Sequence, residues 1–85
     1  MIQNKLLDHD QEILEIRIYC YEPDWKDTLA SRLMELSIQG WWYESYIFTK
    51  EDYAGFILDL RFIRFRNGSN TTNIDASIIE QLISL

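Results

Sequence analysis

Two runs of sequence between residues 41 and 66 decide the fold: WWYESYIFT (41–49) and AGFILDLRFIRFR (54–66). β-branched and aromatic residues dominate both runs, as is typical of strands. In the second run, one alternating set of side chains is wholly apolar, and the other mixes charge with large apolar groups. Successive side chains of a strand point to opposite faces, so this run has one buried and one half-exposed face. Only Lys50 to Tyr53 separate the runs, which predicts a hairpin.

The two faces of this hairpin are not equally clear from the sequence. In the second strand the buried face is predicted to hold Phe56, Leu58, Leu60 and Phe62, and the outer face Ile57, Asp59, Arg61, Ile63 and Phe65. In the run Trp41–Thr49, periodicity leaves two alternatives open. Either Trp42, Tyr46 and Phe48 share a face with Glu44, or Trp41, Tyr43 and Ile47 share one with Ser45.

A strand and a helix are predicted before the hairpin. In residues 13–21, Leu14, Ile16, Ile18 and Cys20 alternate with Glu15, Arg17, Tyr19 and Tyr21, so the first set is expected to be buried. Pro23 and Asp24 then open a helix, where a missing N–H costs nothing and negative charge suits the helix dipole. An apolar stripe at helical spacing follows, and Gly40 is expected to end the helix in a left-handed conformation. The stripe consists of Trp25, Leu29, Leu33 and Leu36.

A second helix is predicted at the end of the sequence. Thr72 and Asp75 have the spacing of a capping box. Apolar residues then recur at helical spacing. They are Ile74, Ile78, Leu82 and Leu85.

The element order is therefore β-α-β-β-α, which predicts an α+β two-layer sandwich. It matches the ferredoxin-like order β-α-β-β-α-β without the last strand. The expected sheet is antiparallel with strand order 1-3-2 and both helices on one face. Residues 1–85 are expected to form one small domain, with residues 1–12 as a mobile N-terminal arm. The first strand would be an open edge, which predicts a homodimer through strand 13–21 or through the open sheet face.

Composition and charge narrow the class of function. The chain has 85 residues, 14 % of them aromatic, so it is expected to fold. Fourteen acidic residues against eight basic ones give a net charge of −6, which argues against direct nucleic-acid binding. That charge either favours a basic protein partner or only keeps the protein soluble. Arg61, Arg64 and Arg66 interleave with apolar residues, but alternation splits them between two faces, and the glycine-bearing pattern of RNA-recognition domains is missing.

No enzyme activity or cofactor is predicted. The single histidine, His9, lies in the acidic N-terminal arm, and Cys20 is expected to be buried, so no nucleophile–base pair is indicated. The three glycines stand too far apart for a phosphate-binding loop. Asp8, His9 and Asp10 are interpreted as a solvated acidic loop, because three consecutive side chains rarely converge on one metal ion. No metal site is therefore predicted.

Two partner-binding surfaces are predicted. The first is acidic and consists of Asp8, Asp10, Glu12, Glu22, Asp24, Asp27, Glu51 and Asp52. The second is an aromatic face for a partner or a dimer mate, because Tyr, Trp and Arg are enriched in binding hot spots. It consists of Arg17, Tyr19, Tyr21, Trp41, Tyr43, Arg61, Ile63 and Phe65. If the sheet order is right, the hairpin link and the start of the first helix lie at the same end of the molecule.

In size, acidity and lack of catalytic residues, the chain resembles phage-encoded inhibitors of bacterial defence, such as anti-CRISPR proteins, and toxin-neutralising immunity proteins. That resemblance implies an inhibitor that docks on a basic, nucleic-acid-handling protein. One alternative is an assembly subunit that uses the aromatic sheet face in a larger complex. Another is a small-ligand regulatory dimer, although such modules place a glycine in the strand–helix loop, here Tyr21 to Asp24.

The N-terminus has neither the basic start nor the apolar stretch of a secretory signal. No segment reaches the roughly 20 apolar residues of a membrane span. The sequence therefore predicts a cytoplasmic protein, of the cell or of an infected host cell, with no membrane partner.

Overall fold

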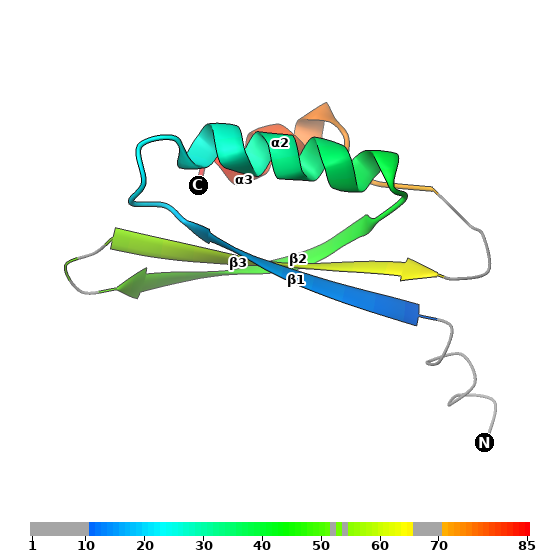
Figure 1. Cartoon of the computed structure of the whole chain (residues 1–85), viewed down its shortest axis with the longest axis horizontal. Coiled ribbons are helices and arrows are strands. Elements are labelled where there is room, and N and C mark those ends of the chain that lie inside the picture. Colours follow the sequence, from blue (N-terminus) through cyan, green and yellow to red (C-terminus); the bar gives the residue numbers. More distant parts are fainter. Residues whose placement is uncertain (1–10, 52, 54, 66–70) are drawn as a thin grey trace, which may run out of the picture.

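The computed structural model describes residues 11–51, 53, 55–65 and 71–85. Three strands and two helices follow one another along this part of the chain (Figure 1). They are β1 (Gln11–Tyr19), α2 (Trp25–Ile38), β2 (Trp42–Glu51), β3 (Gly55–Phe65) and α3 (Ala76–Ile83). The first strand begins earlier than the sequence indicated, so Gln11 and Glu12 belong to the sheet and not to an arm.

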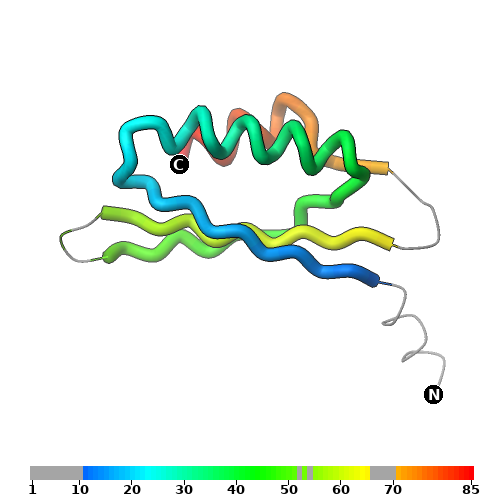
Figure 2. Tube along the Cα trace, viewed as in Figure 1, coloured from blue at the N-terminus to red at the C-terminus, as the bar shows by residue number. Residues whose placement is uncertain are grey.

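The three strands form one antiparallel sheet in the order β1-β3-β2. Both helices lie on the same side of this sheet, and the other side is left open (Figures 1 and 2). The predicted α+β sandwich, with its strand order and its ferredoxin-like arrangement without a last strand, is confirmed. The strand order makes β1 and β2 the two edges.

The core lies between the sheet and the helices. Leu29, Leu33 and Leu36 of α2 are buried, as their helical spacing predicts. They pack with buried residues of the other elements. These are Ile18, Trp41, Leu58, Leu60, Phe62, Ile74 and Leu82.

The end of α2 is fixed by a Schellman motif. Gly40 has φ of 79°, and its N–H donates to the Ser37 carbonyl at 3.1 Å. The Trp41 N–H donates to the Leu36 carbonyl at 2.9 Å, and both side chains lie in the core. The prediction that Gly40 ends the helix in a left-handed conformation is confirmed. The motif also turns the chain so that Trp41 points into the core.

The second helix begins later than its capping-box spacing indicated. Asp75 is the N-cap of α3, and its carboxylate accepts a hydrogen bond from the Ile78 N–H at 3.0 Å. Thr72 does not cap this helix. Its hydroxyl instead donates to the Trp41 carbonyl at 2.6 Å and accepts from the Ile74 N–H at 3.0 Å. The residues before α3 therefore bind the start of β2.

A bulge in β2 explains why periodicity did not resolve its faces. The register with β3 shifts between Tyr43 and Ser45, so Glu44 is an extra residue. Tyr43 lies opposite Phe62, on the helix side of the sheet, whereas Trp42 lies opposite Ile63, on the open side. After the bulge, Tyr46 and Phe48 return to the helix side, and Ser45 and Ile47 lie on the open side. Neither predicted set stays on one face.

Two exposures in β3 differ from the predicted ones. Phe56 was expected in the core but is 41 % exposed, and its ring stacks on that of Phe48 at 4.7 Å. Ile57 was expected on the exposed face but is 7 % exposed. It does lie on the open side, where its cross-strand neighbours are Tyr19 and Thr49. Ile57 is thus buried although it lies on the side of the sheet that no helix covers (Figure 1).

Candidate protein-binding surfaces

Of the predicted acidic residues that the structure describes, Glu12 lies apart from the other four. Asp8, Asp10 and Asp52 lie outside the described residues. Glu12 lies directly opposite Arg64, and its Oε1 is 2.9 Å from the Arg64 Nε. Arg64 also donates to the Gln39 carbonyl at the end of α2, so Glu12 lies far from the start of that helix. Glu12 therefore has a structural ion pair and is removed from the candidate binding residues.

The four remaining acidic residues come together at one end of the molecule, as predicted. Glu22 and Asp24 lie in the connection from β1 to α2, Asp27 in the first turn of α2, and Glu51 at the end of β2. This connection runs beside the β2–β3 hairpin (Figure 1). All four side chains are exposed.

Contacts between backbones fix this arrangement. The Cys20 N–H donates to the Phe56 carbonyl at 2.8 Å. Gly55 has φ of 110°, and a Cβ at this position would lie 3.1 Å from the Tyr21 Cβ. Glycine is needed there because an L side chain would be strained in this conformation and crowded by Tyr21. We call this end of the molecule, with residues 21–27, 51 and 53, the hairpin end.

Aromatic side chains accompany the carboxylates at the hairpin end. Tyr53 is fully exposed, and Tyr21 is half exposed and meets Tyr19 edge-on at 5.6 Å. Asp24 is the N-cap of α2, but its side chain makes no capping hydrogen bond, so the helix does not occupy its carboxylate. Lys26 lies over the ring of Trp25 at 5.6 Å. The hairpin end thus combines negative charge with exposed tyrosines.

The open face of the sheet carries most of the predicted aromatic face. Arg17, Tyr19, Arg61, Ile63 and Phe65 lie on it in neighbouring register positions of β1 and β3. Tyr21 lies just beyond β1, at the hairpin end. The exposed apolar side chains on this face are Ile13, Tyr19, Trp42, Ile47 and Phe65.

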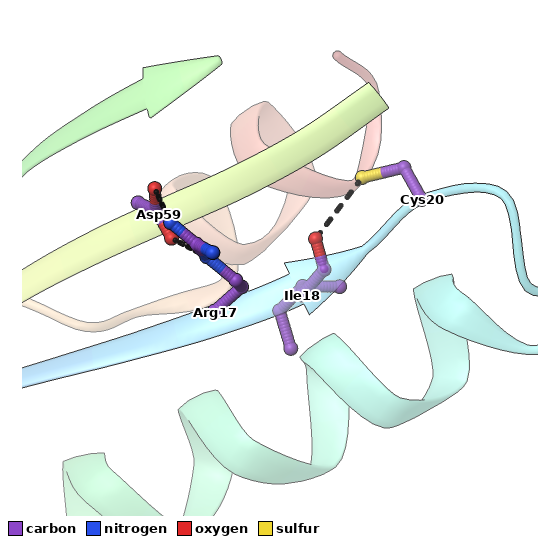
Figure 3. A network of polar contacts seen from close by, with 4 residues as sticks. All are labelled: Arg17, Ile18, Cys20 and Asp59. Atoms are coloured by element: carbon purple, nitrogen blue, oxygen red, sulfur yellow. Dashed lines mark hydrogen bonds and ion pairs between the residues drawn. The ribbon is translucent and has the colours of Figure 1, made fainter. Parts of the chain in front are cut away.

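Two ion pairs balance charge on the open face. The Arg17 Nε donates to the Asp59 Oδ1 at 2.8 Å, and the Arg17 Nη2 donates to the Asp59 Oδ2 at 3.1 Å (Figure 3). This hydrogen bonding lowers the pKa of Asp59 and raises the pKa of Arg17. Arg61 pairs with Glu44 at 3.4 Å. The arginines of this face are therefore already paired with carboxylates and are poorly suited to phosphate.

The sequence-based placement of Trp41 and Tyr43 on this face is wrong. Trp41 is only 7 % exposed and lies in the core, with the Arg64 guanidinium 4.3 Å above its ring. Tyr43 is half buried on the helix side and meets Phe62 edge-on at 6.0 Å. Burial raises the pKa of its hydroxyl, with a smaller contribution from Tyr46. The turn after Gly40 and the bulge at Glu44 produce this placement.

Sequence reasoning missed the role of Arg64. It binds Glu12, Trp41 and the Gln39 carbonyl, and so joins β1, β3 and the end of α2. A positive charge beside the last carbonyls of a helix is favourable. The signal in the sequence was its position on the apolar face of β3, where a charge needs a partner. Arg64 is thus on the face opposite to Arg61, as alternation predicted, and Arg66 lies outside the described residues.

Cys20 is half buried, not fully buried as expected. Its Sγ lies 3.9 Å from the Ile18 carbonyl, and burial raises the pKa of the thiol (Figure 3). A raised pKa disfavours the thiolate. Among the residues described, no group of three His, Cys, Asp or Glu side chains is placed to hold a metal ion. His9 lies outside them.

A hollow of about 270 Å³ lies away from the loop where a regulatory ligand was expected. It is lined by Gly40, Trp42, Ile63, Arg64, Phe65 and Thr71, and not by residues 21–24.

No protein-family model, curated protein or solved structure matches this chain. Neither helix of the described part of the chain is long and apolar enough to cross a membrane.

Proposed function

We propose that this protein is a non-enzymatic binding module that docks, through its hairpin end, on a basic protein that handles nucleic acid. The observation that carries the proposal is the meeting of four exposed carboxylates and two exposed tyrosines at one end. They come from a loop, a helix start and a hairpin, and the backbone hydrogen bond from Cys20 to Phe56 joins the loop to the hairpin where Gly55 lies close to Tyr21.

The charge of the chain supports a basic partner. A net charge of −6 attracts a basic surface over a distance of about one Debye length, and exposed carboxylates add local attraction. Carboxylates also pair well with the arginine and lysine side chains that bind phosphates. If Glu22, Asp24 and Glu51 cover the basic surface with which the partner binds nucleic acid, this protein competes with nucleic acid for that surface. An inhibitor or neutraliser acts in this way.

The tyrosines supply the other part of a binding site. Charge mainly raises the association rate and selects the partner, whereas buried aromatic side chains supply most of the affinity. Tyr21 and Tyr53 have large rings that are exposed in the free protein. The expected interface therefore has Tyr21 and Tyr53 at its centre and the carboxylates around them.

Two double variants with the same change in net charge test this proposal. Glu22→Lys with Glu51→Lys reverses charge at the hairpin end. Glu35→Lys with Glu80→Lys, on exposed positions of α2 and α3, is the control. Each variant and the wild type are immobilised, and proteins captured from a cytoplasmic extract of the source organism are identified by mass spectrometry.

The expected result is a basic, nucleic-acid-binding protein that the wild type and the control retain and the hairpin-end variant loses. The captured protein is then purified and mixed with the wild type to establish direct binding. Equal capture by both double variants, or a captured protein with no basic surface, would contradict the proposal.

A second candidate function is supported by the open face. Ile47 is 66 % exposed there, and Trp42 and Phe65 are also exposed. Trp42 and Phe65 line one hollow together with Ile63, and contiguous exposed apolar groups mark interaction sites, so this face suits a subunit of a larger assembly. In that case Ile47→Asp or Phe65→Asp would abolish assembly, and the charge reversals at the hairpin end would be tolerated.

A further inference from the structure

The two edges of the sheet differ in how they are protected. At β2, the Asn73 side chain accepts from the Tyr43 N–H at 2.7 Å and donates to the Tyr43 carbonyl at 3.0 Å. Its amide thus occupies the edge as another strand would, and the bulge at Glu44 interrupts the regular edge beyond it. In β1, the register with β3 is regular from Gln11 to Tyr19, and the strand contains neither proline nor lysine. Within the described residues, no strand pairs with its outer side.

The hydrogen bond of Cys20 shows which groups of β1 face outward. Because Cys20 lies in register with Phe56 and donates to it, these residues form a hydrogen-bonded pair. Such pairs alternate along an antiparallel ladder. The backbone N–H and carbonyl groups of Ile16 and Ile18 therefore also bond to β3. The N–H and carbonyl groups that point to the outer edge belong to Gln11, Ile13, Glu15, Arg17 and Tyr19.

A second copy of β1, running antiparallel, can meet this edge in few registers. In such a pair, a residue whose N–H and carbonyl point to the outer edge must lie opposite a residue of the same kind in the other copy. These residues alternate along β1 with residues that bond to β3. A register centred between two residues would set the two kinds opposite each other, so it is excluded. A register centred on Glu15 places two glutamates opposite each other, and one centred on Arg17 places two arginines opposite each other. Like charges directly opposite are destabilising. The register centred on Ile16 places Glu15 of each copy opposite Arg17 of the other.

The same register matches the apolar residues. On the open face, Ile13 of each copy meets Tyr19 of the other. On the helix face, Ile16 meets its own copy, and Leu14 meets Ile18. Leu14 and Ile16 are only half buried in the single chain, so pairing would complete their burial.

The charges on the open face also continue across this edge. Arg17 is paired with Asp59 on its inner side, and Glu15 lies opposite Arg61. In the register centred on Ile16, Arg17 has Asp59 on one side and Glu15 of the second copy on the other. Positive and negative side chains then alternate across four strands. Charges on an edge strand usually deter pairing, but here they complement their own copy.

From this match we propose that the outer edge of β1 binds β1 of a second copy of the chain, antiparallel and centred on Ile16. The product is a homodimer with one continuous six-stranded sheet and all helices on one side. Since α2 covers the β1 side of the sheet, the two α2 helices would lie next to each other (Figure 1). The interface uses none of the acidic residues of the hairpin end, so it is independent of the proposed function.

Disulfide cross-linking tests the register. Residues opposite each other in a pair without hydrogen bonds have Cα atoms about 4.5 Å apart, within the range of a disulfide. Ile16→Cys in a Cys20→Ala background is therefore expected to form a covalent dimer under mild oxidation. Leu14→Cys in the same background is the control. Leu14 faces Ile18, and the two Leu14 positions lie four residues apart, or about 13 Å along the strand.

Light scattering with a charge swap tests the interface in the otherwise native chain. The wild type is expected to have twice the 10.2 kDa mass of the chain. Glu15→Arg is expected to be monomeric. Glu15→Arg combined with Arg17→Glu and Asp59→Arg, which reverses the charges but keeps the pair between positions 17 and 59 within the chain, is expected to restore the dimer. Circular dichroism checks that each variant is folded. A folded wild-type monomer, including one whose edge is covered by residues 1–10, would overturn the proposal. A dimer that cross-links through Leu14→Cys but not through Ile16→Cys would also overturn it.

Discussion

Replacing Arg64 with methionine should lower the free energy of unfolding by about 2–3 kcal/mol. The guanidinium over the buried Trp41 ring contributes about 1 kcal/mol. The half-exposed ion pair with Glu12 contributes about 1 kcal/mol or less. The hydrogen bond from the charged group to the Gln39 carbonyl contributes about 1.5 kcal/mol. Methionine keeps part of the packing of the arginine stem, so the loss should be somewhat below the total.

Arg61→Met is the matched control. Arg61 lies on the same strand, but it is exposed on the open face and makes one ion pair at 3.4 Å. Its removal should cost about 0–1 kcal/mol. Urea unfolding is followed by circular dichroism, because the change beside Trp41 would itself alter tryptophan fluorescence. All variants are compared at one protein concentration, since self-association would add to the stability. Equal losses for the two variants would refute the view that Arg64 joins β1, β3 and α2.

Three further predictions concern single residues. Gly55→Ala should destabilise the protein by about 1–3 kcal/mol in urea unfolding, because φ is positive there and Tyr21 leaves no room; a neutral effect would contradict this. Asp59→Asn should lower stability above pH about 5, and the difference from wild type should shrink as the pH falls below about 4, because Arg17 lowers the pKa of Asp59 in the folded state. If the stability difference between Asp59→Asn and the wild type grew in acid, the prediction would be contradicted. Cys20 should react with iodoacetamide more slowly than free cysteine at pH 8, because burial raises the pKa of its thiol; an equal rate would disprove the shielding.

The architecture of this protein could be predicted from its sequence because local patterns determine it. The apolar alternation in residues 58–62 gave the buried face of β3, and the spacing of Leu29, Leu33 and Leu36 gave the core face of α2. Gly40 gave the end of that helix. The strand order followed from the order of the elements, without any knowledge of side-chain contacts.

The placements that failed depend on contacts between distant residues. A prediction from alternation assumes that successive residues of a strand always point to opposite faces. In β2 the extra residue Glu44 interrupts this regular alternation. Thr72 has the sequence context of a cap, but the carbonyl of Trp41 competes for its hydroxyl. The exposure of Phe56 reflects how far the hairpin extends, which no local pattern encodes.

The candidate sites divide in the same way. The meeting of Glu22, Asp24 and Glu51 at one end followed from topology and was predicted. The withdrawal of Glu12 into a pair with Arg64 required the register of β1 against β3. Sequence alone gives the type of charge at a position, whereas the register decides whether that charge is already paired.

The association rate with the captured partner tests the central claim, that the hairpin end docks through its charge, most directly. It is measured by stopped flow at low and high salt for the wild type, Glu22→Lys with Glu51→Lys, and Glu35→Lys with Glu80→Lys. The account predicts that at low salt the hairpin-end variant associates about tenfold more slowly or worse, and that the control stays close to the wild type. High salt should reduce these differences. Equal slowing by both double variants would show that net charge alone acts, and would contradict a docking site at the hairpin end.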